Sequence, residues 1–294
     1  MSYVKVGTDA SGNDVKLHYL DLNAGNAQGT VVLIHGWPLS GAMWDYQLAE
    51  LPKHGLRVIA YDRRGFGQSS KPWDGYDYDT FAADLKALLD ELDLHNVTLV
   101  GFSMGGGEVA RYMARYGGAR VSRVAFVGSI TPYLLKTDDN PDGVDKDTFD
   151  TMVENINKDR ADFLQTFSKQ FYGVNLVSHP VSQAHLEGDF ARAYMASHKA
   201  TVDCVRAFSE TDFRHDLTQI QVPTLIIHGD SDKTVPIESS GELTANALPS
   251  AHYIVYDGAP HGLFVTHKDR LNQDLLAFVQ EGVTNRQTAG ATAY

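Results

Sequence analysis

The pentapeptide Gly-Phe-Ser-Met-Gly at residues 101–105 holds a serine between two glycines. It follows the apolar run Val-Thr-Leu-Val and precedes a helix-like segment, GGGEVARYMA. A serine on a tight turn between a strand and a helix needs small residues two positions away on either side, because larger side chains would collide with the turn. The start of the helix would direct backbone N–H groups at developing negative charge. We predict that Ser103 is a catalytic nucleophile; the alternative is a glycine-rich turn that contains serine by chance.

A serine hydroxyl needs a base to accept its proton, and histidine is the usual one because its pKa lies near neutrality. In strand–helix hydrolases of this kind, the acid and then the histidine follow the serine along the chain, in loops after late strands. His261 follows the apolar run at 252–257, and Asp232 follows the run at 224–229. Asp230 competes with Asp232, but it is nearer the strand and its side chain could instead hold the turn. We predict Asp232 as the acid and His261 as the base.

Acyl transfer also needs two N–H donors for the oxyanion. One should be the backbone N–H of Met104, directly after the nucleophile. The other should come from the loop after the apolar run at 30–34, where Trp37 is the candidate because Pro38 has no N–H. His35, at the start of this loop, is interpreted as bracing the loop rather than as a second base.

Other histidines give no sign of a metal site. His228 and His252 fall within strand-like runs and are interpreted as structural. No H-E-x-x-H spacing occurs, and the chain has one cysteine, so neither a zinc motif nor an internal disulfide is expected.

Bulk composition bounds the partners. The 294 residues carry 25 Lys+Arg against 37 Asp+Glu, a net charge of −12. Such a surface repels phosphate backbones and anionic membranes, so we expect no nucleic-acid or membrane partner. The first twenty residues lack the pattern of a signal peptide and no apolar run is long enough to span a bilayer, so a cytoplasmic protein is expected.

The elements that must position these residues are short apolar runs rich in Val and Ile, separated by helix-like segments. They do not alternate with polar residues, which is typical of strands buried on both faces of a parallel sheet. Strand–helix alternation predicts an α/β fold with a mostly parallel, doubly wound sheet. A β-hairpin is expected before it, from residue 4 to residue 20. The runs occupy residues 30–36, 57–62, 97–103, 121–128, 224–230 and 252–257.

One interval breaks this rhythm: from about residue 131 to 215 the chain is helical and aromatic, without a strand-like run. We predict a core of residues 1–130 and 215–282, with a helical cap inserted at 131–214. Residues 283–294 are small and polar and are predicted to form a flexible tail.

Several motifs resemble the cofactor-free (non-haem) haloperoxidase and aryl esterase family of α/β-hydrolases, over about residues 3 to 280. The matching segments are HGWPLS, YDRRGFGQSS, GFSMGGGE, FYG, KATVDCVRAFSETDFR, HGDSDKTVP and APHGLFVTH. The resemblance implies the α/β-hydrolase fold and the hydrolysis of aryl and small alkyl esters through an acyl-enzyme. It also implies use of hydrogen peroxide in place of water to release a peracid, without a metal or haem cofactor, and a homo-oligomer. Pro38 after Trp37 is similar to the perhydrolase members.

The same resemblance implies a substrate pocket. Ile130, Phe167 and Phe171 match positions that line the acyl pocket of the family, and Val235 and Phe264 flank the acid and the base. Ordinary core packing is the alternative for each of them.

Other functions remain open at this point. Some relatives open lactones or γ-lactams, and a C–C bond hydrolase would keep the same triad. Dehalogenases and epoxide hydrolases need a carboxylate where Ser103 stands, which argues against them. A small-molecule receptor on the hydrolase fold would bind without turnover.

Overall fold

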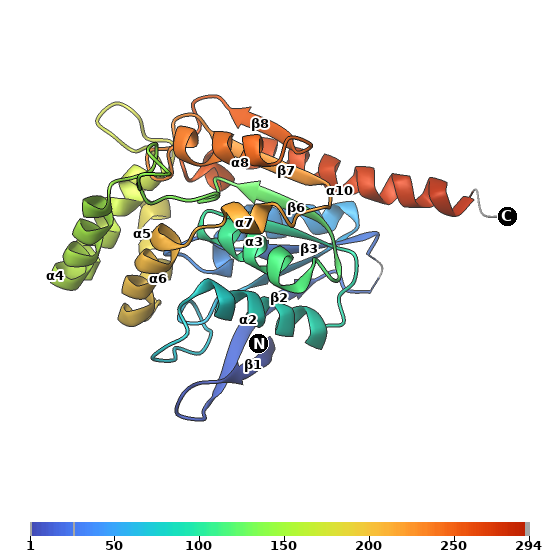
Figure 1. Cartoon of the computed structure of the whole chain (residues 1–294), viewed down its shortest axis with the longest axis horizontal. Coiled ribbons are helices and arrows are strands. Elements are labelled where there is room, and N and C mark those ends of the chain that lie inside the picture. Colours follow the sequence, from blue (N-terminus) through green and yellow to red (C-terminus); the bar gives the residue numbers. More distant parts are fainter. Residues whose placement is uncertain (1, 26, 292–294) are drawn as a thin grey trace.

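An eight-stranded sheet lies at the centre of the protein in a computed structural model, which describes residues 2–25 and 27–291 (Figure 1). Its strand order is β1-β2-β4-β3-β5-β6-β7-β8. β2 pairs antiparallel with β1 and β4, whereas the remaining neighbours pair in parallel. The predicted mostly parallel sheet is confirmed. The strands are β1 (Ser2–Thr8), β2 (Asp14–Leu22), β3 (Gly29–Ile34), β4 (Leu56–Tyr61), β5 (Val97–Phe102), β6 (Val121–Val127), β7 (Thr224–Gly229) and β8 (His252–Tyr256).

The apolar runs of the sequence correspond to strands β3 to β8, and the expected hairpin is β1–β2. Every residue of β5 and of β7 is buried, because helices cover both faces of the sheet. Successive side chains of a strand point to opposite faces. Accordingly Val32 and Ile34 of β3 belong to one core cluster, and Val31 and Leu33 to the other.

Helices cover the two faces of the sheet. One face lies under α2 (Tyr78–Glu91), α3 (Met104–Tyr116), α7 (Arg214–Leu217) and α8 (Gly241–Ala247). The opposite face lies under α1 (Asp45–Glu50), α9 (Leu263–Thr266) and α10 (Lys268–Ala291). Short 3₁₀ turns complete the connections, at Gly41–Trp44, Leu51–His54 and Ile237–Ser239.

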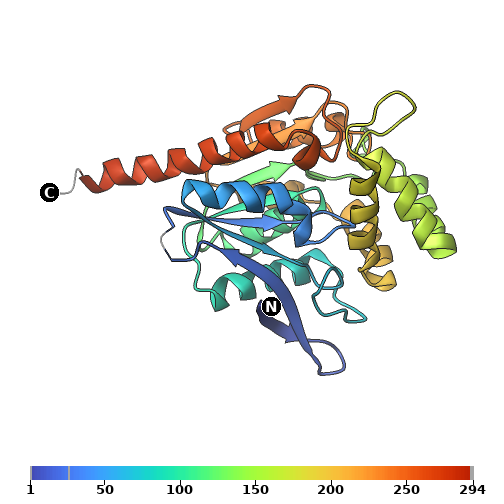
Figure 2. The same ribbon diagram turned by 180° about the vertical axis from the view of Figure 1, so that it is seen from behind.

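Helices α4 (Lys146–Phe171), α5 (Gln183–Tyr194) and α6 (His198–Glu210) lie between β6 and β7 in the sequence. They gather at one end of the sheet, on the left in Figure 1 and on the right in Figure 2. α4 is interrupted at Asp159, whose backbone is not helical and whose carboxylate accepts the N–H of Asp162 at 3.0 Å, as an N-cap does. The helical character predicted for this interval is present, and the division into core and cap stays a prediction.

The C-terminal helix α10 runs to Ala291, through most of the segment 283–294. The flexibility predicted for this segment stays a prediction. No proline interrupts residues 268–291, so the hydrogen-bonded ladder continues beyond the part of the helix that is packed on the core. Residues 292–294 lie outside the described residues.

Candidate active site

Ser103 sits at the junction of β5 and α3 with positive φ (52°) and ψ of −120°. A non-glycine residue in such a conformation is strained, at a cost of about 1–3 kcal/mol. The flanking glycines make the turn possible. A Cβ on Gly101 would lie 2.5 Å from the carbonyl oxygen of Gly105, and a Cβ on Gly105 would lie 2.6 Å from that of Ile34. The predicted need for small residues on both sides of the serine is therefore confirmed.

Ser103, Asp232 and His261 are in contact, although they lie far apart in the sequence. Asp232 comes 129 positions after Ser103, and His261 comes 29 positions after Asp232. The Ser103 hydroxyl donates to Nε2 of His261 at 3.0 Å, and Nδ1 of His261 donates to Oδ2 of Asp232 at 2.5 Å, with the tautomer assigned from these partners. All three side chains are buried. Aromatic rings hold the imidazole, since the ring centroids of Phe102 and Phe171 each lie 4.8 Å from that of His261.

The carboxylate of Asp232 is fully engaged. Its Oδ1 accepts the N–H groups of Thr234 and Val235 at 2.9 and 2.8 Å. Burial alone would raise the pKa of Asp232, but the charge of His261 and the hydrogen bonds from His228 and His261 outweigh it and hold this pKa well below its usual range. The carboxylate is therefore ionised at neutral pH and can stabilise an imidazolium.

His228, near the end of β7, and Asp230, directly after this strand, make different contacts. Nε2 of His228 lies 2.9 Å from the Val235 carbonyl oxygen and 3.4 Å from Oδ2 of Asp232. The sequence analysis interpreted His228 as a structural strand residue. Its position at the end of β7, four residues before Asp232, was the feature that could have indicated its contact with Asp232. Asp230 instead accepts the N–H of Gly258 at 2.7 Å and so holds the turn, as its alternative interpretation proposed.

The loop after β3 lies directly against the nucleophile. A Cβ on Gly36 would lie 2.9 Å from Cβ of Ser103. The N–H groups of Trp37 and Met104 have no protein acceptor among the described residues, which leaves them free to donate to a ligand. The Trp37 indole N–H donates to the Thr201 carbonyl oxygen at 3.0 Å, which fixes this loop to α6.

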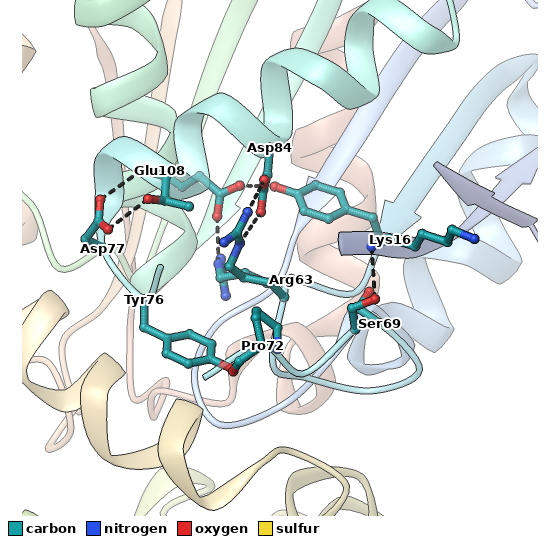
Figure 3. A network of polar contacts seen from close by, with 12 residues as sticks. Lys16, Arg63, Ser69, Pro72, Tyr76, Asp77, Asp84 and Glu108 are labelled. Atoms are coloured by element: carbon teal, nitrogen blue, oxygen red, sulfur yellow. Dashed lines mark hydrogen bonds and ion pairs between the residues drawn. The ribbon is translucent and has the colours of Figure 1, made fainter. Parts of the chain in front are cut away.

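A buried polar network around Arg63 and Glu108 braces the same loop, and Figure 3 shows the contact between these two side chains. Arg63, which is 1% exposed, donates from Nε to Glu108 of α3 at 2.7 Å and from Nη2 to the His35 carbonyl oxygen at 2.9 Å. Its backbone N–H donates to Nε2 of His35 at 2.9 Å, and Tyr61 donates to Glu108. These contacts join the loops after β3 and β4 to the nucleophile helix. Sequence reasoning assigned His35 to bracing but gave no role to Arg63 or Glu108, although both lie in segments that resemble the family.

A cavity of about 330 Å³ opens at Ser103. Three of the residues predicted to line a substrate pocket line it, namely Ile130, Phe167 and Val235. Phe171 and Phe264 do not, and here the prediction needs correction. Both are buried around the catalytic residues instead: Phe171 packs on His261, and Phe264 packs on Phe102 with ring centroids 5.0 Å apart. Phe171 was taken for a pocket residue from the family resemblance, and Phe264 because it lies three positions after His261.

Two further features concern metal binding and membranes. Among the described residues, no cluster of three or more His, Cys, Asp or Glu side chains is arranged to hold a metal ion. No helix in the same part of the chain combines the length and apolar character that crossing a membrane requires.

Comparisons with known proteins agree with this geometry. Residues 29–268 match the model of the alpha/beta hydrolase fold family. A non-heme chloroperoxidase of Streptomyces lividans is 42% identical over 277 residues, covering 94% of this chain and 100% of the relative. A bifunctional esterase/perhydrolase of Acinetobacter calcoaceticus is 38% identical over 276 residues, 94% of this chain and 100% of the relative. The crystal structure of a bromoperoxidase from Bacillus anthracis superimposes with a TM-score of 0.90 and 48% identity, covering 95% of this chain and 99% of that one.

Proposed function

Because the chain belongs to the alpha/beta hydrolase fold family, we propose that this hydrolase cleaves carboxylic esters through an acyl-enzyme on Ser103. The substrates are aryl and small alkyl esters, and hydrogen peroxide serves as a second acceptor beside water. The observation that carries the proposal is the unbroken contact from Ser103 through His261 to Asp232, at the wall of a cavity.

Acylation follows from these contacts. His261 takes the hydroxyl proton as Oγ of Ser103 attacks the ester carbonyl carbon. The oxyanion of the tetrahedral intermediate accepts the N–H groups of Trp37 and Met104. His261 then protonates the leaving alcohol as the C–O bond breaks, and Asp232 stabilises the imidazolium formed in between.

Deacylation reverses the roles of the groups. His261 takes a proton from water, whose oxygen attacks the acyl carbon, and returns it to Oγ of Ser103 as the acyl bond to serine breaks. With hydrogen peroxide the same proton transfers release a peracid, which then oxidises halide in solution. Two features support the peroxide route: the names of the relatives, and Pro38 next to the oxyanion donor, where the sequence resembles perhydrolases.

Replacing the nucleophile tests the proposal. Ser103→Ala should lower turnover of 4-nitrophenyl acetate by at least about 1,000-fold, because the residual site can only bind and polarise the ester. A fluorophosphonate probe should label the wild-type chain on Ser103 and leave the variant unlabelled. Full esterase activity in Ser103→Ala would refute the mechanism, and tight ester binding without turnover in the wild type would favour a receptor.

The peroxide route needs its own assay. Wild-type enzyme given an acetate ester and hydrogen peroxide should release peracetic acid, measured by bromide oxidation. Ser103→Ala should release none, which separates enzymic perhydrolysis from the background reaction of peroxide with the ester.

A further inference from the structure

The loop that holds the catalytic acid also forms a wall of the cavity. The backbone N–H groups of Thr234 and Val235 turn inward to Oδ1 of Asp232. Gln170, at the end of α4, donates from Nε2 to the carbonyl oxygen of Lys233 at 3.0 Å. The loop is therefore held from both sides, and Lys233 and Thr234 both line the cavity that opens at Ser103.

Lys233 is the one charged residue that lines this cavity. Its side chain is exposed and forms no ion pair with any carboxylate of the described residues. Most other cations of the described chain have partners, as Arg57 does with Asp21 at 2.7 Å. Lys233 thus brings an exposed positive charge, unpaired among the described residues, to the set of residues that line the cavity.

Thr234 adds a second unsatisfied group next to it. Its Oγ1 is buried and has no hydrogen-bond partner in the described structure. A buried hydroxyl without a partner loses its hydrogen bonds to water without replacement, at a cost of about 1–3 kcal/mol by mutational data. Lys233 and Thr234 are neighbours in the sequence, and this polar patch of the cavity lining has no acceptor from the described protein.

The remainder of the cavity wall contrasts with this patch. It is mainly aromatic and aliphatic, with Trp37, Phe149, Phe167 and Phe208 among the lining residues. Its other polar residues carry no charge, namely Ser103, Thr148, Asn155, Thr166 and Gln170. An apolar portion of a substrate fits there, but a neutral ester would leave both Lys233 and Thr234 without an acceptor. A carboxylate would pair with the ammonium and accept the hydroxyl hydrogen, and charge-assisted hydrogen bonds of this kind are the stronger ones.

We propose that this site binds esters that also carry a carboxylate, remote from the ester bond, with Lys233 and Thr234 as the carboxylate's partners. The inference rests on the proposed esterase function, whose substrate class it narrows. The net charge of −12 gives it a further role: an anionic substrate is repelled by the surface as a whole, so a local cation is needed where it enters.

Two pairs of substrates that differ by one charge test the inference. The first is the 4-nitrophenyl half-ester of adipic acid against the same compound with its free carboxylate capped as a methyl ester. The second is 3-carboxyphenyl butanoate against its methyl ester, which moves the charge to the alcohol side. Wild-type kcat/KM should favour the charged member of at least one pair by about fivefold, since a partly exposed ion pair contributes modestly. The preference should shrink as salt is raised.

Variants then locate the preference. In Lys233→Met the ratio within that pair should fall to about one, and in Thr234→Val it should fall part of the way. Lys158→Met is the matched control, because Lys158 of α4 is an exposed lysine that does not line the cavity, and it should keep the wild-type ratio. Each ratio comes from one enzyme sample, so it does not depend on how much of a variant folds.

The outcomes separate the two proposals. A wild-type ratio of one or less for both pairs, or an unchanged ratio in Lys233→Met, overturns the carboxylate site while esterase activity stands. Absence of turnover of the capped esters by the wild type, or equal turnover in Ser103→Ala, overturns the esterase proposal itself.

Discussion

His35 is held as a neutral imidazole by two opposite hydrogen bonds. Nδ1 donates to the Gly36 carbonyl oxygen at 2.9 Å, and Nε2 accepts the N–H of Arg63 at 2.9 Å. A second proton would have to occupy Nε2, where it would face that N–H group. Burial above all, and then the charge of Arg63, hold the pKa of His35 well below its usual value, against the opposing effect of the Gly36 contact.

This arrangement predicts a loss of stability in mild acid. The unfolded chain binds a proton at His35 below about pH 6.5, whereas the folded chain does not, so the free energy of unfolding falls as pH falls through that value. The stabilisation is complete above pH 6.5 and declines by up to about 1.4 kcal/mol per pH unit below it. Urea denaturation between pH 5 and 8 should show a shallower decline in His35→Gln than in the wild type.

The exposed His252 supplies a control for this measurement. His252→Gln also removes one histidine, yet it should retain the wild-type slope. Parallel slopes for His35→Gln and the wild type would contradict the prediction.

At the residue scale, the sequence predicted the contacts among Ser103, Asp232 and His261, because each belongs to a motif or follows a strand in a required order. It did not predict residues whose contacts come from parts of the chain that are distant in sequence or from the shape of a turn. Arg63 and His228 are such residues, since their partners lie in other loops or depend on the shape of a turn. The misplacement of Phe264 has the same origin, because its place three positions after His261 does not tell which way the ring points; it packs on Phe102.

At the scale of elements, the two proposed oxyanion donors belong to separate pieces of chain. Trp37 lies in the loop after β3, and Met104 begins α3. Arg63 connects these pieces, since it contacts the His35 carbonyl oxygen and Glu108 together. The spacing between the two donors therefore depends on the Arg63–Glu108 pair, and oxyanion stabilisation depends on that spacing.

Two substitutions should separate stability from positioning. Glu108→Gln leaves Arg63 buried without its counter-charge, which should lower the free energy of unfolding by about 3–5 kcal/mol. The double variant Arg63→Met/Glu108→Met removes both charges and should recover part of this loss. It should not recover kcat, because the contact to the His35 carbonyl oxygen is still absent, while KM should change less than kcat. Active sites are counted with a fluorophosphonate, so that kcat refers to folded enzyme.

A second buried pair serves as the control. Arg64 contacts Asp84 of α2 at 2.6 and 2.7 Å, and this pair does not touch the loop after β3. Asp84→Asn should lower stability while kcat per active site remains near that of the wild type. Wild-type kcat in the Arg63/Glu108 double variant would show that the pair is only structural.

The strands could be predicted from sequence because burial on both faces leaves a continuous apolar run, as in β5 and β7. Helix interruptions could not be predicted in this way. The break at Asp159 in α4 depends on one residue's backbone angles, and aspartate occurs within helices as well as at their caps. The boundary of a helix depends on whether single residues such as Asp159 adopt helical or capping backbone angles. The type of an element depends on the pattern of the whole segment.

At the scale of the whole molecule, the topology brings the site together. Parallel strands end at the same edge of the sheet, and the segments after β3, β5, β7 and β8 supply the proposed oxyanion loop, nucleophile, acid and base. This is why chain order alone located the acid and the base. The oligomeric state could not be derived in this way, because contacts between copies of the chain follow no fixed order of motifs in the sequence. The homo-oligomer therefore stays a prediction.

The C-terminal helix extends beyond the rest of the molecule in both views (Figures 1 and 2). Its core contacts lie in the first half, where Leu271, Leu275 and Val279 are buried. A helical extension that projects from the rest of the molecule contributes little to stability in water, because most helical stability in proteins comes from packing of an apolar face. We therefore expect that ending the chain after Val283 changes the melting temperature by no more than about 1–2 °C.

Leu275→Ala is the comparison for this truncation, because it removes a fully buried side chain from the packed half of the same helix. It should lower the free energy of unfolding by about 2–5 kcal/mol and the melting temperature by several degrees. Light scattering on the same samples gives the mass of the assembly. If the truncated chain keeps its melting temperature but forms an assembly of fewer copies, the extension joins copies of the chain. If its melting temperature falls as far as that of Leu275→Ala, the extension is packed and the expectation is wrong.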